Sequence, residues 1–229
     1  MLEASLTLLE AGSVCLAFRA LYRLAALALT RGARPAPERL SRLVSCIHAC
    51  ALAALGALAT AQPALLESAW WRGAASALPL GYLAHDADLI WDEPSLWDPW
   101  MLAHHFAFAG LVAAGVKKYP GLAARAFLAE LSTPLLHAAW AARRSGADHR
   151  HPWGTRALGA LLFVTFFYFR AYSLAALAVE AYALGEWLPG ILMSGLAALN
   201  WYWFARLLRH AARACISAPP AARRKHRRI

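Results

Sequence analysis

The sequence contains little charge, and most of what it contains is positive. Only 16% of the 229 residues are Asp, Glu, Lys or Arg, with 23 basic against 13 acidic side chains. Average soluble domains have ~25% charged residues, so this composition disfavours an ordinary soluble protein. A soluble bundle of helices would also need a polar stripe on every helix, and apolar runs such as 51–59 and 158–168 have none.

Cysteine and clustered histidine are scarce as well. The chain has four cysteines and no C-x-x-C, and two cysteines four positions apart on one helix, Cys46 and Cys50, do not normally form a disulfide. Membrane di-iron enzymes need several histidine clusters, whereas this chain has one adjacent pair and His149–Arg150–His151 in a hydrophilic loop. We therefore expect neither a metal ion nor a bound cofactor.

Long apolar segments make up most of the chain. They are roughly 18–25 residues long, enough to cross ~30 Å of hydrocarbon. We predict an all-α, multi-pass membrane bundle of about seven transmembrane helices, a core of six plus an N-terminal helix. The predicted helices cover about 5–29, 38–61, 73–90, 99–115, 122–142, 155–184 and 187–215. The first carries Glu10, Arg19 and Arg23, so a shallow position in the membrane is its alternative.

Three regions follow from this pattern: an N-terminal helix with its linker (1–38), a membrane domain (39–214) and a basic tail (215–229). Basic residues flank the first and fifth connections and fill the tail. With seven spans these places share one side, which the positive-inside rule makes cytosolic. Orientation explains the net charge of +10 without nucleic acid as a partner. Residues 1–11 lack a basic segment, so no cleavable signal peptide is expected.

The adjacent pair His104–His105 marks the first candidate site. Asp98 followed by Pro99 predicts a helix N-terminus, which puts His105 roughly 9 Å inside that helix. Ionisable side chains at such a depth in a membrane are rare and mostly functional. Three other helices carry a His or Asp at a similar depth, roughly 7–13 Å from their cytosolic ends. These residues are His48, Asp86 and His137. We expect the four helices to face a common cavity; the alternative is separate polar contacts between helices.

A second polar layer lies nearer the middle of the membrane. Glu130, Arg170 and Asn200 are each roughly 14–21 Å from either end of their helices. An unpaired charge there costs several kcal/mol, so we predict a Glu130–Arg170 ion pair. Such a pair could serve helix packing or a substrate, and the sequence leaves both open.

Five short motifs, in order along the predicted helices, resemble the TLC-domain family. This family is named after the translocating-chain-associated membrane protein, the yeast ceramide synthase and the ceroid-lipofuscinosis neuronal protein. The motifs are Ser45–Ala49, Gly81–Tyr82 with Asp86, Asp98 with His104–His105, Ala129–Pro134 and Asn200–Phe204. The resemblance spans about 39–213 and is strongest to the small TLC-domain-containing transmembrane proteins.

The resemblance implies a lipid cavity between helices and a role in sphingolipid or phospholipid metabolism or homeostasis. One interpretation is His-dependent acyl transfer of the ceramide synthase type, with acyl-CoA as co-substrate. It implies His104, His105 and Asp86 as catalytic residues. The substrate-binding residues would be His48, Tyr82, Asp98, Glu130, His137, Arg170 and Asn200. The alternative is a non-catalytic protein for lipid binding, lipid sensing or cargo trafficking.

The resemblance also sets expectations for partners and location. Membrane lipids are the expected partners, with acyl-CoA added if the protein is an enzyme, and a homodimer stays open. The expected location is the endoplasmic reticulum or another endomembrane, with the plasma membrane as the alternative.

Overall fold

The computed structural model describes residues 2–29 and 37–216, and these are almost entirely helical, with no strand among them. The predicted linker around 30–36 and the tail from 217 onward lie outside the described residues. The all-α prediction is confirmed. Among the described residues, three helices are long and apolar enough to span a membrane by length and composition, namely Thr7–Leu29, Pro37–Ala61 and Pro152–Ala183.

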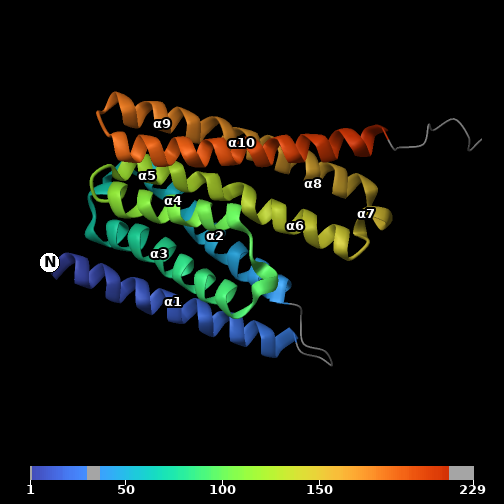
Figure 1. Cartoon of the computed structure of the whole chain (residues 1–229), viewed down its shortest axis with the longest axis horizontal. Helices are drawn as coiled ribbons and strands as arrows, with labels where there is room; N and C mark the ends of the chain where they lie inside the picture. Colours follow the sequence, from blue (N-terminus) through green and yellow to red (C-terminus); the bar gives the residue numbers. More distant parts are fainter. Residues whose placement is uncertain (1, 30–36, 217–229) are drawn as a thin grey trace, which may run out of the picture.

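Within the described ranges, seven helical rods run back and forth along one axis (Figure 1). Four are single helices: α1 (Leu2–Leu29), α2 (Pro37–Ala61), α3 (Ala69–Asp92) and α4 (Pro99–Gly115). The fifth rod joins α5 (Pro120–Phe127), η3 (Leu128–Leu131) and α6 (Ser132–Arg144). The sixth joins α8 (Pro152–Thr165), η4 (Phe166–Tyr172) and α9 (Ser173–Ala183), and α10 (Trp187–Ile216) is the seventh. Short turns η1 (Pro63–Glu67), η2 (Pro94–Leu96) and α7 (Ala147–Arg150) lie between rods.

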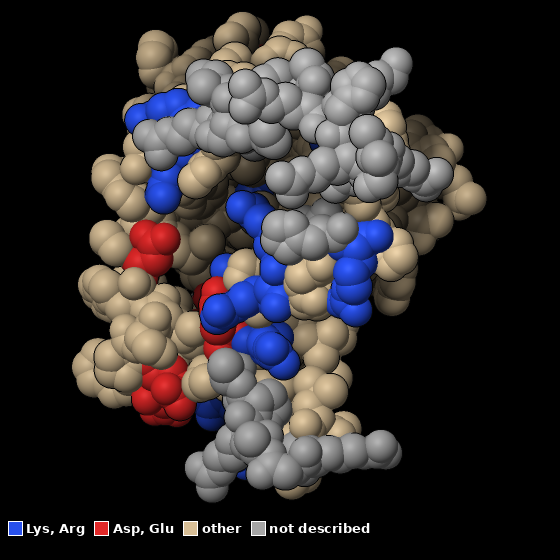
Figure 2. Space-filling view, turned by 90° about the vertical axis from the view of Figure 1, so that its right-hand side faces the viewer, with Lys and Arg blue, Asp and Glu red and all other residues tan. Residues whose placement is uncertain are grey.

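Arginine gathers at one end of the bundle, where α2 and α8 begin and α6 ends (Figures 1 and 2). We call this the arginine-rich end. It carries Arg39, Arg42, Arg143, Arg144, Arg150 and Arg156. The basic residues of the first and fifth connections thus share one end, as predicted, and the cytosolic side stays a prediction. The turns between α4 and α5 and between α9 and α10 lie at the opposite end.

The helix α1 packs along α3 rather than lying apart from the bundle (Figure 1). Close approach depends on Gly81, because a Cβ there would lie 2.6 Å from the Val14 Cβ and 2.7 Å from the Ala11 carbonyl oxygen. An ion pair between Arg19 and Asp88 joins the same two helices. The first helix is thus part of the bundle, and its shallow position in the membrane stays an alternative.

Two rods predicted as continuous α-helices are interrupted at the same level. Pro134 has no N–H, and its ring clashes with the carbonyl four residues earlier, at Glu130. The chain accordingly tightens into the 3₁₀ segment η3 just before it. Opposite η3, the sixth rod widens into the π-helical segment η4, a form that is frequent at functional sites. These irregular turns face each other inside the bundle and carry Glu130 and Arg170.

Candidate functional site

The two adjacent histidines of α4 point into different compartments. Asp98 caps the helix as predicted, accepting a hydrogen bond from the Trp100 N–H at 2.9 Å, and Pro99 is the first helical residue. Neighbouring positions on an α-helix project about 100° apart. His105 therefore faces α2 and α3, whereas His104 faces the rods that carry Glu130 and Arg170.

The compartment around His105 brings together four of the predicted site residues from α2, α3 and α4. The Nδ1 atom of His105 lies 3.5 Å from Oδ2 of Asp86, and these side chains are only 12% and 10% exposed. His48 stacks on Tyr82 with ring centroids 4.0 Å apart and planes 8° apart. The edge of Tyr82 approaches His105, with centroids 6.4 Å apart. A buried imidazole thus lies close to a carboxylate, beside an aromatic stack, although His105 Nδ1 has no hydrogen-bond partner among the described residues.

Two further side chains complete this compartment, and the sequence did not single them out. Phe18 of α1 lies against Tyr82, with centroids 5.5 Å apart, and against His48 at 6.0 Å. His85 is buried and lies parallel to Phe18 at 6.2 Å. His85 directly precedes Asp86, which was a usable signal for a second buried imidazole. Phe18 gave no signal, because its place depends on how closely α1 approaches α3.

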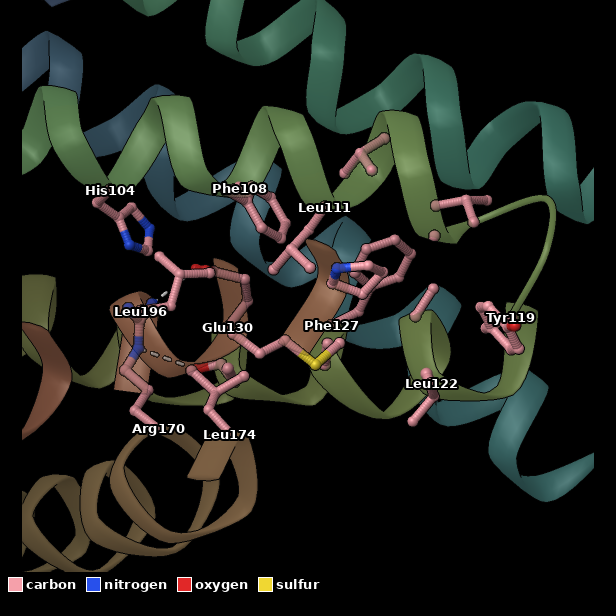
Figure 3. A pocket seen from close by; sticks show the side chains of 18 residues that line it. His104, Phe108, Leu111, Tyr119, Leu122, Phe127, Glu130, Arg170, Leu174 and Leu196 are labelled. Atoms are coloured by element: carbon pink, nitrogen blue, oxygen red, sulfur yellow. Dashed lines mark hydrogen bonds and ion pairs between the residues drawn. The ribbon is translucent and has the colours of Figure 1, made fainter. Parts of the chain in front are cut away.

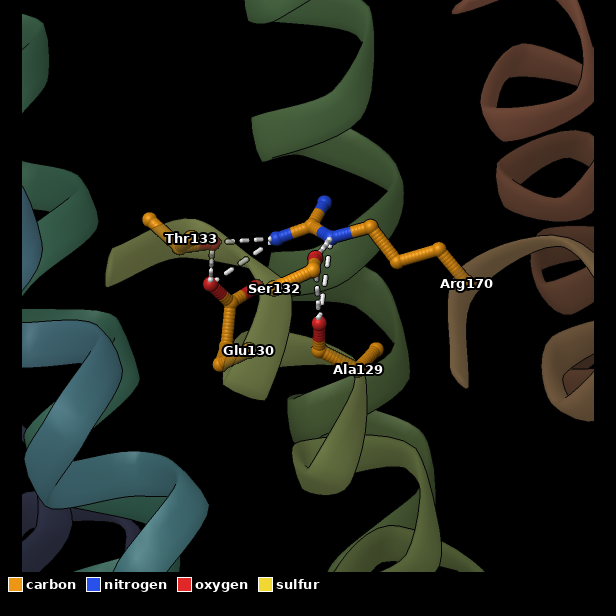
Figure 4. Close-up of polar contacts among 5 residues, drawn as sticks. All are labelled: Ala129, Glu130, Ser132, Thr133 and Arg170. Atoms are coloured by element: carbon orange, nitrogen blue, oxygen red, sulfur yellow. Dashed lines mark hydrogen bonds and ion pairs between the residues drawn. The ribbon is translucent and has the colours of Figure 1, made fainter. Parts of the chain in front are cut away.

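The second compartment is built on a network around Arg170 (Figure 4). Its Nη2 donates to Glu130 Oε2 at 2.9 Å and to Thr133 Oγ1 at 2.6 Å. Its Nε donates to Ser132 Oγ at 2.8 Å and to the Ala129 carbonyl at 3.1 Å. The predicted Glu130–Arg170 ion pair is thus confirmed. The third guanidinium nitrogen points away from the network (Figure 4).

A narrow cavity, here called the slot, runs from this network toward the opposite end (Figure 3). His104, Glu130 and Arg170 line its polar end. The remaining wall is almost wholly apolar and comes from α4, α5, α9 and α10, with side chains such as Phe108, Leu111, Phe127, Leu174 and Leu196. Its volume is about 30 Å³, counted as room for the centre of a water molecule. Tyr119 closes the far end, in the turn that follows α4.

The slot does not lie where the sequence predicted a cavity, although the rings of His104 and His105 are only 5.8 Å apart. We expected a hollow facing His48, Asp86, His105 and His137, but none of these four lines the slot. The physical reason lies in packing: Phe18 and Tyr82 fill the space around His48 and His105. His104, Glu130 and Arg170 are the predicted residues that reach the slot.

Three predicted site residues lie apart from both compartments. Asp98 is exposed at the start of α4. His137 lies near the arginine-rich end, with its Nδ1 3.4 Å from Arg42 Nη1. Asn200 is fully buried and donates to the Leu196 carbonyl at 2.8 Å. Their predicted roles in binding stay predictions.

A basic rim surrounds His137. The Arg42 guanidinium lies over the Trp140 ring at 4.6 Å, and that of Arg144 lies 5.7 Å from the same ring. Glu38 pairs with both arginines, at 3.1 and 3.4 Å. No group of three His, Cys, Asp or Glu in the described part of the chain could hold a metal ion.

The far end of the slot is tied by three side chains outside the helices. The Lys118 ammonium donates to Glu186 Oε1 at 2.6 Å, and the Tyr119 hydroxyl donates to the same oxygen. Both hydrogen bonds lower the pKa of Glu186 below its ordinary value, and the one from Lys118 has the larger effect. The contact joins the α4–α5 turn to the α9–α10 turn.

The comparisons with known proteins agree with the motifs and with the fold. No individual curated protein and no solved structure matches the chain. A family model described as the TLC domain matches residues 40–209, within the predicted membrane domain at 39–214. That match covers well over half of the sequence and includes the slot and the residues around His105 apart from Phe18, so the chain belongs to the TLC-domain family.

Proposed function

We propose that this membrane protein acts in lipid homeostasis by holding one acyl chain of a lipid in the slot. The observation that carries the proposal is the slot itself, with apolar walls along its length and a polar network at one end (Figure 3). Binding pockets for small ligands commonly combine apolar walls with a few polar groups that fix orientation. The location of the protein in an endomembrane stays a prediction.

The shape of the slot favours a single extended chain. Its room for water centres, about 30 Å³, is small for a cavity that extends along about three turns of α4. A sterol ring system or two chains side by side would require the helices to separate. One extended chain requires the least separation, because only the leucine, methionine and phenylalanine side chains of the wall have to move apart.

The polar end favours a head that accepts hydrogen bonds. The Glu130–Arg170 pair is neutral as a unit, so it attracts no net charge. The remaining guanidinium nitrogen of Arg170 can donate to a carbonyl or carboxyl oxygen. His104 lies at the same end and can donate or accept, depending on its tautomer.

Lipid extraction and native mass spectrometry of the purified chain test this function. We expect wild type to carry an acyl-chain lipid, and Ala126→Phe, which places a ring in the slot, to lose most of it. Ala113→Phe on the exposed side of α4 is the matched control and should keep the lipid. A lipid-free wild type, or equal occupancy in both variants, would contradict the proposal.

Acyl transfer is a second candidate, favoured by the contact between His105 and Asp86. A buried imidazole oriented by a carboxylate can act as a general base or as a nucleophile. As a nucleophile, the ring nitrogen would attack the thioester carbonyl of acyl-CoA, and the thiolate would leave and take up a proton. An amine or hydroxyl of a lipid would then accept the acyl group and regenerate the imidazole. Arginines of the rim at Arg42, Arg143 and Arg144 would bind the phosphates.

Incubation of the purified protein with labelled acyl-CoA separates the two candidates. Transfer of label to a lipid acceptor, or an acyl adduct lost in His105→Ala and kept in His151→Ala, supports catalysis. His151 is exposed at the arginine-rich end and is a suitable control. Binding of intact lipid with neither transfer nor adduct leaves the binding function alone.

A further inference from the structure

The slot ends at a wall whose position is fixed. Tyr119 lies at the end away from His104 (Figure 3). Its hydroxyl donates to Glu186, which Lys118 holds from the other side at 2.6 Å. The ring therefore cannot swing aside without breaking a hydrogen bond that joins two turns of the bundle.

One turn before this wall, the slot is lined by a glycine, Gly115, that lies beside open space. A Cβ built on Gly115 meets no atom within 4 Å, although Gly115 lines the slot. On the same helix, a Cβ on Gly110 would lie 3.0 Å from Leu192 Cδ1, so helix packing accounts for that glycine. No close approach between helices accounts for Gly115. It lies roughly 17 Å along α4 from His104, where the last carbons of a bound chain would be.

We infer that Gly115 and Tyr119 together set the length of the acyl chain that the protein accepts. This inference rests on the proposed binding function. With the lipid head at His104, the terminal methyl group passes Gly115 and stops at Tyr119. A shorter chain leaves a gap before the wall, and a longer chain cannot enter fully.

The preference for one acyl-chain length must come from packing rather than from hydrophobicity. Competing chains come from a lipid phase that is as apolar as the slot, so a longer chain gains no hydrophobic advantage by entering. A methyl-sized gap in a packed interior costs ~1 kcal/mol, which corresponds to about fivefold in affinity. Each missing carbon near Tyr119 should therefore reduce binding by on the order of fivefold.

The test uses the full-length protein in nanodiscs. The ligands are an equimolar mixture of saturated free fatty acids of graded length. Native mass spectrometry reports which lengths bind. Wild type should select a narrow range of lengths. Gly115→Phe should shift the distribution to shorter chains, and Tyr119→Ala should shift it to longer ones. Tyr119→Phe keeps the ring but removes its hydrogen bond to Glu186, so it should shift the distribution less than Tyr119→Ala does.

The control is Gly195→Phe on α10, where a Cβ also meets no atom within 4 Å but which does not line the slot. It should leave the distribution unchanged. Gly115→Leu is a second variant at the same position, for use if the phenylalanine ring of Gly115→Phe prevents folding. If wild type binds no fatty acid, the binding function itself fails. If wild type binds and neither the Gly115 variants nor Tyr119→Ala shift the lengths, the assignment of length selection is wrong and binding stands.

Discussion

Removing the Arg170 side chain should destabilise the bundle more than any ordinary surface change. In Arg170→Met, four hydrogen bonds disappear, and the Glu130 carboxylate, 12% exposed, keeps only its contact with Thr133 at 2.6 Å. Removing one partner of a buried ion pair costs ~3–5 kcal/mol, because the other charge stays buried without compensation. We take this range as the expected loss in the free energy of unfolding.

A double-mutant cycle isolates the contribution of the pair. Glu130→Gln leaves a guanidinium that cannot lose its charge, although three neutral acceptors still surround it. The double variant Glu130→Gln/Arg170→Met contains neither charge. It should therefore be less destabilised than the sum of the two single variants, with a coupling energy in the upper part of the ~0.5–3 kcal/mol range for residues in contact.

The assay is the fraction of protein that stays monodisperse in detergent after heating. At ~2–4 °C per kcal/mol for a chain of this length, Arg170→Met should lower the midpoint by about 6–20 °C. Arg170→Lys should fall between wild type and Met, because an ammonium lacks the fork that reaches several acceptors at once. Strictly additive single variants, or an unchanged midpoint for Arg170→Met, would refute the reasoning.

Two smaller perturbations test other parts of the fold. Gly81→Val places a Cβ 2.6 Å from the Val14 Cβ, so we expect a loss of ~1–3 kcal/mol from overpacking. Thermal midpoints should show it, while Gly12→Val on α1, which meets no atom within 4 Å, should change little. Hydrogen bonds from Lys118 and the neighbouring tyrosine lower the pKa of Glu186 from its unfolded value of 4.5. The stabilisation that this carboxylate gives to the fold is therefore present above pH 4.5 and is lost as the pH falls below 4.5. The midpoint of wild type should then fall more steeply in acid than that of Glu186→Gln, and parallel curves would contradict the contact.

The rods and the ion pair could be predicted because each depends on local information. Long apolar segments between polar connections define a helix that crosses the membrane, whatever its neighbours are. Asp98 and Pro99 define a helix start within a few residues. Glu130 and Arg170 are the charges deep in their helices, and a membrane interior leaves them few partners but each other.

The place of the slot could not be predicted, because it depends on which neighbour each helix face meets. The sequence puts His48, Asp86 and His105 at one level, and the structure does bring them together. Whether the space between them is filled depends on Phe18, from a helix whose approach is set by Gly81. The depth of a residue along a helix can be predicted from the sequence. Whether a side chain from a distant helix fills the space beside that residue cannot.

The separation of two adjacent histidines leads to a prediction about their roles. His104 lines the slot, whereas the neighbouring His105 does not line it and lies 3.5 Å from Asp86. His104→Ala should therefore reduce binding from the fatty acid mixture. His105→Ala should leave that binding close to wild type and abolish any acyl adduct or transfer. Both variants can be measured in the same nanodisc preparation, with the thermal midpoint as a check on folding. If the two substitutions reduce binding and transfer to the same extent, the two compartments act as one site, and the division of roles along α4 is wrong.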